Sequence, residues 1–451
     1  MKHSSLVFPP RCALAACVIL AAPVAAAALD AAPDLFNPAV RAAFQPELPR
    51  IPDRTFDIKA YGAVGDDHTA NTEAIQSAID AARKAGGGTV IVPAGAFLSG
   101  PIRLANNINL RVEAGATLRM LPLDRYPGGT SSPGNFIEGS DLHDVAITGS
   151  GTIDGQGKPW WPFAKVKGAG RPRMIKLSGC KRVLIERVTL VNSPMFHIAI
   201  SGRSAEVTVR GVTIHAPASD DPVAPSHNSD ACDVSGTNIL IRDCDISVGD
   251  DNFTCGGGTS NVLITHNTYG YGHGVSIGSP TSGGVSNLAV VDCTFNRTEC
   301  GIRIKSDRDR GGLVTHLLYE NLRMTDVRCP ILVYAAYMAP EREYRDLNKL
   351  TAEIATRYPG QSLQPRTPIY RDIVFRNITA TAEKGRRAGL IWGLPEAPVT
   401  GLRLENVKIT ADRPFGIYNA NDVRMVGSTI TTTEGVNKLS TGNAQVDIAD
   451  R

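Results

Sequence analysis

The sequence lacks a strong net charge. Its 451 residues carry 47 Lys and Arg against 44 Asp and Glu, which leaves a formal charge of +3. So weak an overall field excludes long-range attraction as the way this chain finds an acidic partner, and such binding must come from cations placed locally. We therefore expect no nucleic-acid partner.

Long apolar runs are also missing, apart from one stretch from Cys12 to Ala28. It follows a basic start and ends in small residues, which predicts a secretory signal peptide over residues 1–28 with cleavage after Ala28. The run is too short and too Ala-rich for a membrane span, so we expect no membrane partner and a secreted or periplasmic protein. Leu14 to Cys17 loosely resembles a lipoprotein site, but the apolar run continues past Cys17.

The chain has no CxxC motif and no paired-histidine spacing, so nothing in the sequence indicates a metal site. Seven cysteines remain after residue 28, and an odd number leaves at least one thiol without an intramolecular partner. Several occupy apolar strand positions, where buried thiols stacked on one another are the simplest interpretation, although export permits disulfides.

A strand-like unit with an apolar residue at every second position recurs along the chain. The units begin at Val183, Val207, Ile239, Val262, Leu288, Leu317, Ile373, Leu402 and Val423. Successive starts lie 24, 32, 23, 26, 29, 56, 29 and 21 residues apart, and earlier units begin near Ile108 and Val145. Repetition of this length with strand alternation predicts a β-solenoid. The step of 56 equals two coils, or one coil with a long insertion.

We therefore predict an all-β chain, a single-stranded right-handed parallel β-helix over residues 51–451. A leucine-rich horseshoe or a propeller would need other repeat patterns, and an antiparallel sandwich remains the rival architecture. Residues 29–50 read as an Ala- and Pro-rich leader. A helix after Asn71 and Thr72 is expected to cap the N-terminal end, and residues 339–369 are expected to be an insertion that protrudes, with a short helix from Leu347 to Tyr358.

Four polar clusters recur at intervals close to one coil, which would stack them on one face. Asp230 and Asp251 lie 21 positions apart, Asp251 and His273 lie 22 apart, and His273 and Arg303 lie 30 apart. The clusters are Asn228-Ser229-Asp230, Gly249-Asp250-Asp251, Gly272-His273-Gly274 and Arg303-Ile304-Lys305. The earlier Gly65-Asp66-Asp67 precedes a helix start and is interpreted as a turn.

This set of side chains suits acid-catalysed hydrolysis of an acidic polymer. Adjacent carboxylates such as Asp250 and Asp251 raise one another's pKa, which a general acid requires. Arg303 and Lys305 share one strand face and can hold a carboxylate. The glycines around His273 would let a polymer approach the backbone. Asn228 is equally well explained as a turn residue.

In this order and spacing, the four clusters resemble the polygalacturonase family of glycoside hydrolases, family 28, over residues 52 to about 435. The resemblance implies inverting hydrolysis of α-1,4-linked galacturonate in pectin or polygalacturonate, with no metal or cofactor. It implies Asp250 as proton donor, Asp230 and Asp251 as the pair activating water, His273 assisting, and Arg303 with Lys305 on the substrate carboxylate. Tyr337 resembles a family tyrosine beside the substrate. We expect a monomer.

The chain departs from the family pattern in two places. Ser229 replaces the common Thr, and Asn252 stands where a Cys often follows the paired aspartates, so no disulfide can be assumed there. Rhamnogalacturonan or xylogalacturonan hydrolysis is the nearest alternative activity. A pectate lyase would instead need a calcium cluster and an arginine base, and a non-catalytic carbohydrate-binding solenoid would need no acid pair. Endo or exo action is open.

Overall fold

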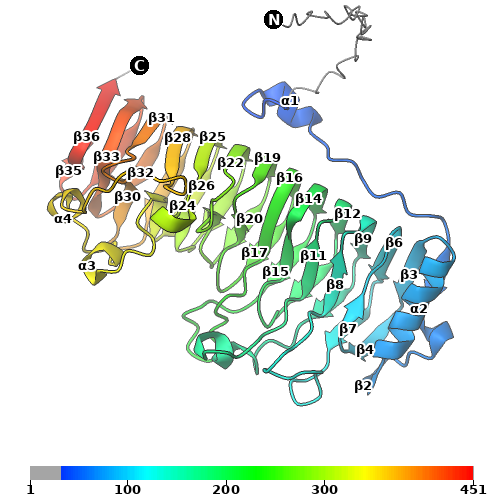
Figure 1. The fold of residues 1–451 in the computed structure, drawn as a ribbon. Coiled ribbons are helices and arrows are strands. Elements are labelled where there is room, and N and C mark those ends of the chain that lie inside the picture. The colour runs from blue at the N-terminus through cyan, green and yellow to red at the C-terminus, as the bar shows by residue number, and fades with distance from the viewer. Residues whose placement is uncertain (1–31, 450–451) are drawn as a thin grey trace, which may run out of the picture. The chain divides into compact units, whose positions relative to one another are not determined.

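Coils of short strands stack in parallel into a right-handed β-helix in the computed structural model, which describes residues 32–449 (Figure 1). The coils have three faces, here called A, B and C. Faces A and B belong to one 22-stranded sheet, because four long strands turn the corner between them, and face C is a separate 14-stranded sheet. The fold class predicted from the repeats is confirmed.

The strand bounds are as follows. Face A holds β5 (Ile102–Arg103), β8 (Ile137–Ser140), β11 (Ile175–Ser178), β18 (Phe253–Cys255), β21 (Val275–Ile277), β24 (Cys300–Lys305), β27 (Cys329–Tyr334) and β30 (Arg387–Trp392). Face B holds β1 (Thr55–Asp57), β3 (Gly88–Val92), β6 (Ile108–Val112), β9 (His143–Gly149), β12 (Lys181–Glu186), β19 (Thr259–Thr265), β22 (Val285–Val291), β25 (Leu313–Glu320), β28 (Ile369–Arg376) and β31 (Val399–Glu405). Both faces share β14 (Ile198–Arg210), β16 (Cys232–Arg242), β33 (Arg413–Val426) and β36 (Leu439–Ala449).

Face C holds β2 (Asp66–Ala70), β4 (Gly95–Ser99), β7 (Ala116–Met120), β10 (Thr152–Asp154), β13 (Thr189–Val191), β15 (Thr213–His215), β17 (Asp245–Ser247), β20 (Thr268–Gly270), β23 (Thr294–Asn296), β26 (Arg323–Val327), β29 (Thr379–Ala382), β32 (Lys408–Thr410), β34 (Thr429–Thr432) and β35 (Gly435–Val436). The helices are α1 (Pro38–Ala43), α2 (Thr72–Lys84), α3 (Arg342–Arg345) and α4 (Ala352–Thr356), and the 3-10 turns are η1 (Ile58–Tyr61), η2 (Trp161–Lys165) and η3 (Arg308–Arg310).

The predicted repeat units are face B strands, and each predicted start lies opposite the next in the hydrogen-bonding register. Val183 pairs with Val207, and the series continues without a break to the pairing of Leu402 with Val423. Every second residue points inward and is buried, as the alternation predicts. Leu317 pairs directly with Ile373, so the 56-residue step is one coil carrying an insertion.

Helix α2 covers the N-terminal end of the coil stack, as predicted (Figure 1). Its four apolar residues Ile75, Ala78, Ile79 and Ala82 are fully buried against the first coils. Asn71 occupies the N-cap position, but its side chain bonds to the backbone of the preceding loop and makes no capping bond. The first Gly-Asp-Asp leads into the irregular strand β2, where Asp67 has a φ of 64° and Asp66 accepts the backbone N–H groups of two residues that follow it.

The insertion between β27 and β28 differs from its prediction, because it folds back onto the C-terminal coils. The predicted helix from Leu347 to Tyr358 shortens to α4, which begins after Thr351 as its N-cap, and α3 precedes it. Helix α4 contacts β33 and β36, and Tyr344 and Tyr358 pack around Trp392. These buried aromatic side chains hold the segment down where a protruding loop was expected.

Residues 34–50, here called the N-terminal strap, run along the outside of face B. They belong to the leader predicted over residues 29–50, which the structure describes from residue 32. Leu35 is buried in a second apolar cluster with face B side chains from β16 to β28, and Arg41 forms an ion pair with Glu320. Further along the strap, the backbone N–H of Arg50 donates to Asp144 of β9 at 2.8 Å. The strap therefore crosses many coils, in the direction opposite to their order in the chain (Figure 1).

All seven cysteines in the described residues are free thiols, and six of them are buried. This agrees with the interpretation of buried thiols. Cys300 and Cys329 lie opposite each other on β24 and β27.

Candidate active site

Three successive coils bring the predicted polar clusters together where face C strands lead into face A strands. Asn228 and Asp230 lie in the loop between β15 and β16, Asp250 and Asp251 between β17 and β18, and His273 between β20 and β21. Because Cys232 pairs with Phe253 and Phe253 with Val275, the three loops stack directly on one another. The sequence intervals of 21 and 22 therefore correspond to true coil steps.

Tight backbone packing fixes the loop that carries the paired aspartates. The hydroxyl of Ser229 accepts the N–H of Gly249 at 2.8 Å. A Cβ on Gly249 would lie 2.3 Å from the Ser226 hydroxyl, so only glycine is accommodated. Ser229 thus keeps the hydroxyl function at the position where the family pattern commonly has Thr.

The backbone on both sides of His273 requires glycine, for a reason that the sequence analysis did not give. Gly272 and Gly274 have φ of 76° and 78°, and a Cβ on either would collide with a backbone carbonyl of the adjacent coil. Asn252 is buried and its side-chain oxygen accepts the N–H of Gly274 at 2.8 Å. Asn252 therefore fixes the backbone of the turn that carries His273.

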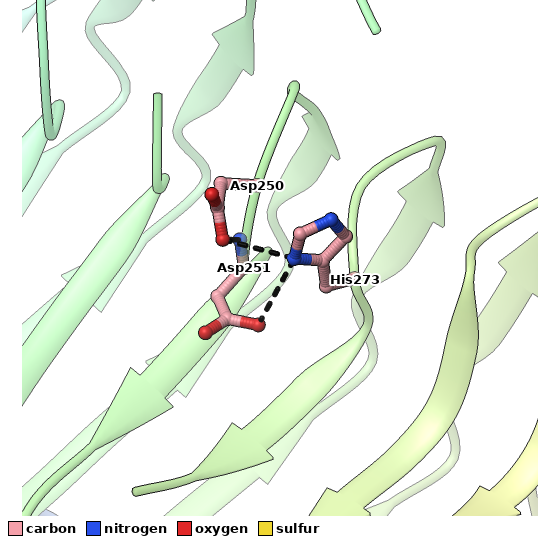
Figure 2. Close-up of side chains that lie close together, drawn as sticks. All are labelled: Asp250, Asp251 and His273. Carbon is pink, nitrogen blue, oxygen red and sulfur yellow. Dashed lines mark hydrogen bonds and ion pairs between the residues drawn. The ribbon is translucent and has the colours of Figure 1, made fainter. Parts of the chain in front are cut away.

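His273 contacts Asp250 through one ring nitrogen (Figure 2). Its Nδ1 lies 2.9 Å from Asp250 Oδ1 and 3.0 Å from Arg303 Nη2, while its Nε2 lies 3.3 Å from Glu299 Oε2. The side-chain amide of Asn228 donates to Asp250 Oδ2 at 3.3 Å. Asp250 is thus hydrogen-bonded on both oxygens, and the imidazole lies between two carboxylates.

Asp251 is held by two cations that lie two coils further along, on β24, and by Ser276 of the coil between them. Its Oδ1 accepts from the Ser276 hydroxyl at 2.6 Å and from Arg303, and its Oδ2 accepts from Lys305 Nζ at 3.0 Å. Arg303 and Lys305 are themselves buried, while Ile304 between them points into the core, as the strand alternation predicted. Within residues 32–449, both cations are therefore ion-paired inside the site, with Asp251 as the carboxylate they share.

These contacts reverse the expected effect of two adjacent aspartates. Burial raises the pKa of Asp251, but the charges of Arg303 and Lys305 outweigh it and hold that pKa well below its ordinary value. Burial also raises the pKa of Asp250, but the hydrogen bond and charge of His273 leave it lowered overall. The charge of Asp251 does raise the pKa of Asp250, as expected, but the prediction of a raised pKa was wrong in its net direction, because the cationic neighbours of both carboxylates outweigh this effect.

Among Asp230, Asp250 and Asp251, Asp230 is the carboxyl whose pKa is raised. It is buried, and burial followed by the charges of Asp250 and Asp251 raises its pKa well above the ordinary value. Its Oδ1 has no hydrogen-bond partner within residues 32–449. Asp230 is therefore a buried carboxyl of raised pKa beside two carboxyls whose pKa values are lowered.

A groove of about 660 Å³ runs over these residues and along face A. Asn228, the three aspartates, His273, Arg303 and Lys305 all line it, and so does Tyr337. Lys305 Nζ lies 5.4 Å from the centre of the Tyr337 ring. All eight residues proposed from the sequence thus lie around one groove.

Sequence reasoning missed four polar residues of the site. Asp233 lines the groove floor, where burial raises its pKa to about 6. Ser276 links Arg303 to Asp251, Glu299 faces His273, and Arg171 donates to Asn228 Oδ1 at 2.8 Å. Asp233 could have been found as the outward residue on the strand after Asp230. Arg171 carries no sequence signal, because it lies 57 residues from Asn228.

Asp250, Asp251 and His273 offer ligand atoms close enough together to hold a metal ion. Arg303 and Lys305 already bind the oxygens of Asp251, however, and their positive charge opposes a cation at this place. The donor set therefore suits proton transfer better than metal binding.

Residues 85–429 match the sequence profile of the glycosyl hydrolases family 28, and the chain belongs to this family. An endo-polygalacturonase of Pectobacterium parmentieri is 31% identical over 409 residues, covering 83% of this chain and 91% of that protein. An exopolygalacturonase of Zea mays is 30% identical over 374 residues, covering 79% and 84%. The solved polygalacturonase of Erwinia carotovora ssp. carotovora has a TM-score of 0.63 at 27% identity, covering 89% and 98%.

The protein is thus a glycosyl hydrolase. Its relatives include both endo- and exo-acting enzymes.

Proposed function

We propose that the protein hydrolyses α-1,4-galacturonosyl linkages in pectin or polygalacturonate with inversion at the anomeric carbon. The observation that carries this proposal is that three carboxyls and two buried cations line one groove. Carboxyls supply the acid and base of glycoside hydrolysis, and an Arg with a Lys supplies a partner for a uronate carboxylate. The names of the relatives point to the same substrate class.

Asp250 is the proton donor in this mechanism. It must carry a proton when the glycosidic bond breaks, and His273 Nδ1 at 2.9 Å is placed to share one with it. The proton moves from Asp250 to the glycosidic oxygen as the bond from that oxygen to the anomeric carbon breaks. His273 then restores the proton on Asp250, and Glu299 holds the imidazole in place from its other side.

Asp230 and Asp251 act on the water that attacks the anomeric carbon. Asp230, which lines the groove beside Asp251, can hydrogen-bond the water, and ionised Asp251 takes its proton. In the free site Asp251 is a weak base, because Arg303 and Lys305 bind it. A uronate carboxylate that draws on the same two cations would raise the pKa of Asp251 and make it a better base. Binding of the substrate carboxylate would in this way strengthen the base that activates the water.

The insertion favours exo action, which releases mono- or digalacturonate from chain ends. Its residues Pro340, Tyr358 and Arg366 line a second hollow of about 560 Å³, which adjoins the catalytic groove at Pro280. A segment that walls this end of the groove would stop a polymer from passing through it. Tyr337, next to the insertion, then lies beside the bound terminal units.

The protein acts outside the cytoplasm, in the secretion medium or the periplasm, as a monomer. This proposal relies on the signal peptide predicted over residues 1–28, which lies outside the described residues. Between residues 32 and 449, no helix is long and apolar enough to cross a membrane.

The deciding experiment is digestion of polygalacturonic acid by the purified protein, with product sizing over time. Hydrolysis predicts new reducing ends without new ultraviolet absorbance, because no double bond forms. NMR of the first product should show the β-anomer, as inversion of an α-linkage requires. EDTA should leave the rate unchanged.

Other outcomes point elsewhere. Products that absorb in the ultraviolet, together with inhibition by EDTA, would identify a lyase. Cleavage of rhamnogalacturonan or xylogalacturonan in preference to plain polygalacturonate would replace the proposed substrate. Binding without cleavage would leave only a carbohydrate-binding module. The variant Asp245→Asn, an exposed aspartate on β17 of the same coil as Asp250, serves as a matched control for Asp250→Asn.

A further inference from the structure

A line of outward side chains runs along face A from the catalytic cations toward the N-terminal coils. Arg303 pairs in register with Ser276, Ser276 with Thr254, Thr254 with Asp233, Asp233 with Ala199, and Ala199 with Lys176. Lys176 on β11 therefore lies two coils before Asp233, which is about 10 Å along the stack. A polymer that follows the groove past Asp233 next meets Lys176.

Lys176 is a half-buried cation without a carboxylate partner. Its Nζ donates to the Ser201 hydroxyl at 2.7 Å, and it forms no ion pair within residues 32–449. Burial lowers the pKa of Lys176, the charge of Arg173 lowers it further, and Asp233 acts in the opposite direction. A partly desolvated ammonium beside another cation is costly unless an anion joins it.

Arg173 and Arg203 also form no ion pair with a carboxylate in the part of the chain that the structure describes, and the charge of Arg173 acts on Lys176. The guanidinium of Arg173 stacks 5.1 Å from the centre of the Phe196 ring. Phe196, Ser201 and Arg203 line the same groove as the catalytic residues. Arg303 and Lys305 both bind Asp251, whereas Lys176, Arg173 and Arg203 form no ion pair within residues 32–449. Glu138, which lies in register with Lys176 on β8, pairs with Arg103 instead.

We propose that Lys176, Ser201 and Arg203 form an anion subsite that binds the carboxylate of a uronate unit remote from the scissile bond. Lys176 and Ser201 would contact the carboxylate, while Arg203 closes over it from the exposed rim of the groove. Arg173 adds positive charge from behind Phe196. This inference rests on the proposed hydrolysis of polygalacturonate. The subsite would raise kcat/KM for oligomers long enough to reach it.

The test compares galacturonate oligomers of increasing length. Lys176→Ala should lower kcat/KM about 10-fold on oligomers long enough to reach β11, the loss expected for one charge-assisted hydrogen bond. The same variant should match the wild type within about twofold on the shortest oligomer that is cleaved, because that substrate gains nothing from the subsite. Lys176→Arg should recover most of the loss on long oligomers. Lys181→Ala, an exposed lysine on face B, is the matched control and should change neither rate.

The outcomes separate this inference from the proposed function. If the wild type does not cleave galacturonate oligomers at all, the proposed function fails and the subsite fails with it. If the wild type cleaves them but Lys176→Ala loses nothing, or loses equally on short and long oligomers, only the subsite is wrong. Should Lys176→Ala unfold at lower temperature than the wild type, the exposed Arg203→Gln gives the same comparison without a buried change, and an unchanged length dependence would refute the subsite.

Discussion

Replacing Asp250 by asparagine tests the centre of the mechanism, since asparagine keeps the shape of the side chain and cannot donate the proton. An amide retains the Oδ1 acceptor for the N–H of Asp251 at 2.9 Å and gives up only the 3.3 Å contact with Asn228. We therefore expect a folded protein whose thermal unfolding is close to that of the wild type. The expected fall in kcat is about 10² to 10⁴-fold, the usual contribution of a general acid. This corresponds to about 2.7 to 5.5 kcal/mol of lost transition-state stabilisation.

A sharper test of Asp250 compares substrates whose leaving groups differ in their need for protonation. A galacturonide oligomer with a nitrophenyl leaving group needs little protonation, so Asp250→Asn should lose much less activity on it than on polygalacturonate. Reducing-end release measures one substrate and nitrophenol absorbance the other. A folded variant that keeps more than about a tenth of wild-type turnover on the polymer would remove Asp250 from the mechanism. An equal loss on both substrates would show that Asp250 acts by some means other than proton donation.

Three further predictions address charge, pH and mode of action. Lys305→Ala should weaken use of de-esterified polymer far more than use of methyl-esterified pectin, because esterification already removes the partner carboxylate; equal losses in kcat/KM on the two would assign the lysine to structure. Asp233, whose pKa is raised to about 6, is neutral below that pH and adds a negative charge to the groove floor above it. The KM for polygalacturonate should therefore rise as pH passes through about 6, and Asp233→Asn should abolish that rise; a variant with the wild-type KM profile would contradict this. Early digestion should release mono- or digalacturonate with little change in viscosity, whereas intermediate oligomers and a rapid fall in viscosity would show that the insertion around Tyr358 leaves the groove open.

The coil register could be predicted from the sequence because it depends only on the residues of neighbouring coils. Each face B strand buries alternate residues and contacts only the strands of the neighbouring coils, so apolar starts such as Val262 and Leu288 mark the same position on successive coils. The 56-residue step could not be resolved in that way. Only the direct pairing of Leu317 with Ile373 shows that one coil carries the whole insertion.

The site was harder to predict in detail. The number of residues between two positions depends both on the length of each coil and on how far along its strand each residue lies, and the sequence does not separate the two contributions. The interval of 30 residues suggested that His273 and Arg303 occupy the same position on successive coils. The strand partner of Arg303 is Ser276, however, and not His273. Arg303 therefore lies further along its strand than the interval implied. This displacement brings its guanidinium onto Asp251, a contact across 52 residues that reverses the pKa expected for adjacent aspartates.

The N-terminal strap has a consequence for the order of events during synthesis. Leu35 reaches its native neighbours only when Leu318 and Val374 are in place, whereas each coil needs only the coils beside it. Coils can thus form progressively as the chain emerges, while the strap waits for more than 300 later residues. Residues made near the beginning therefore complete their packing among the last, because a chain interrupted before β28 would lack Val374, one of the face B side chains in the cluster around Leu35.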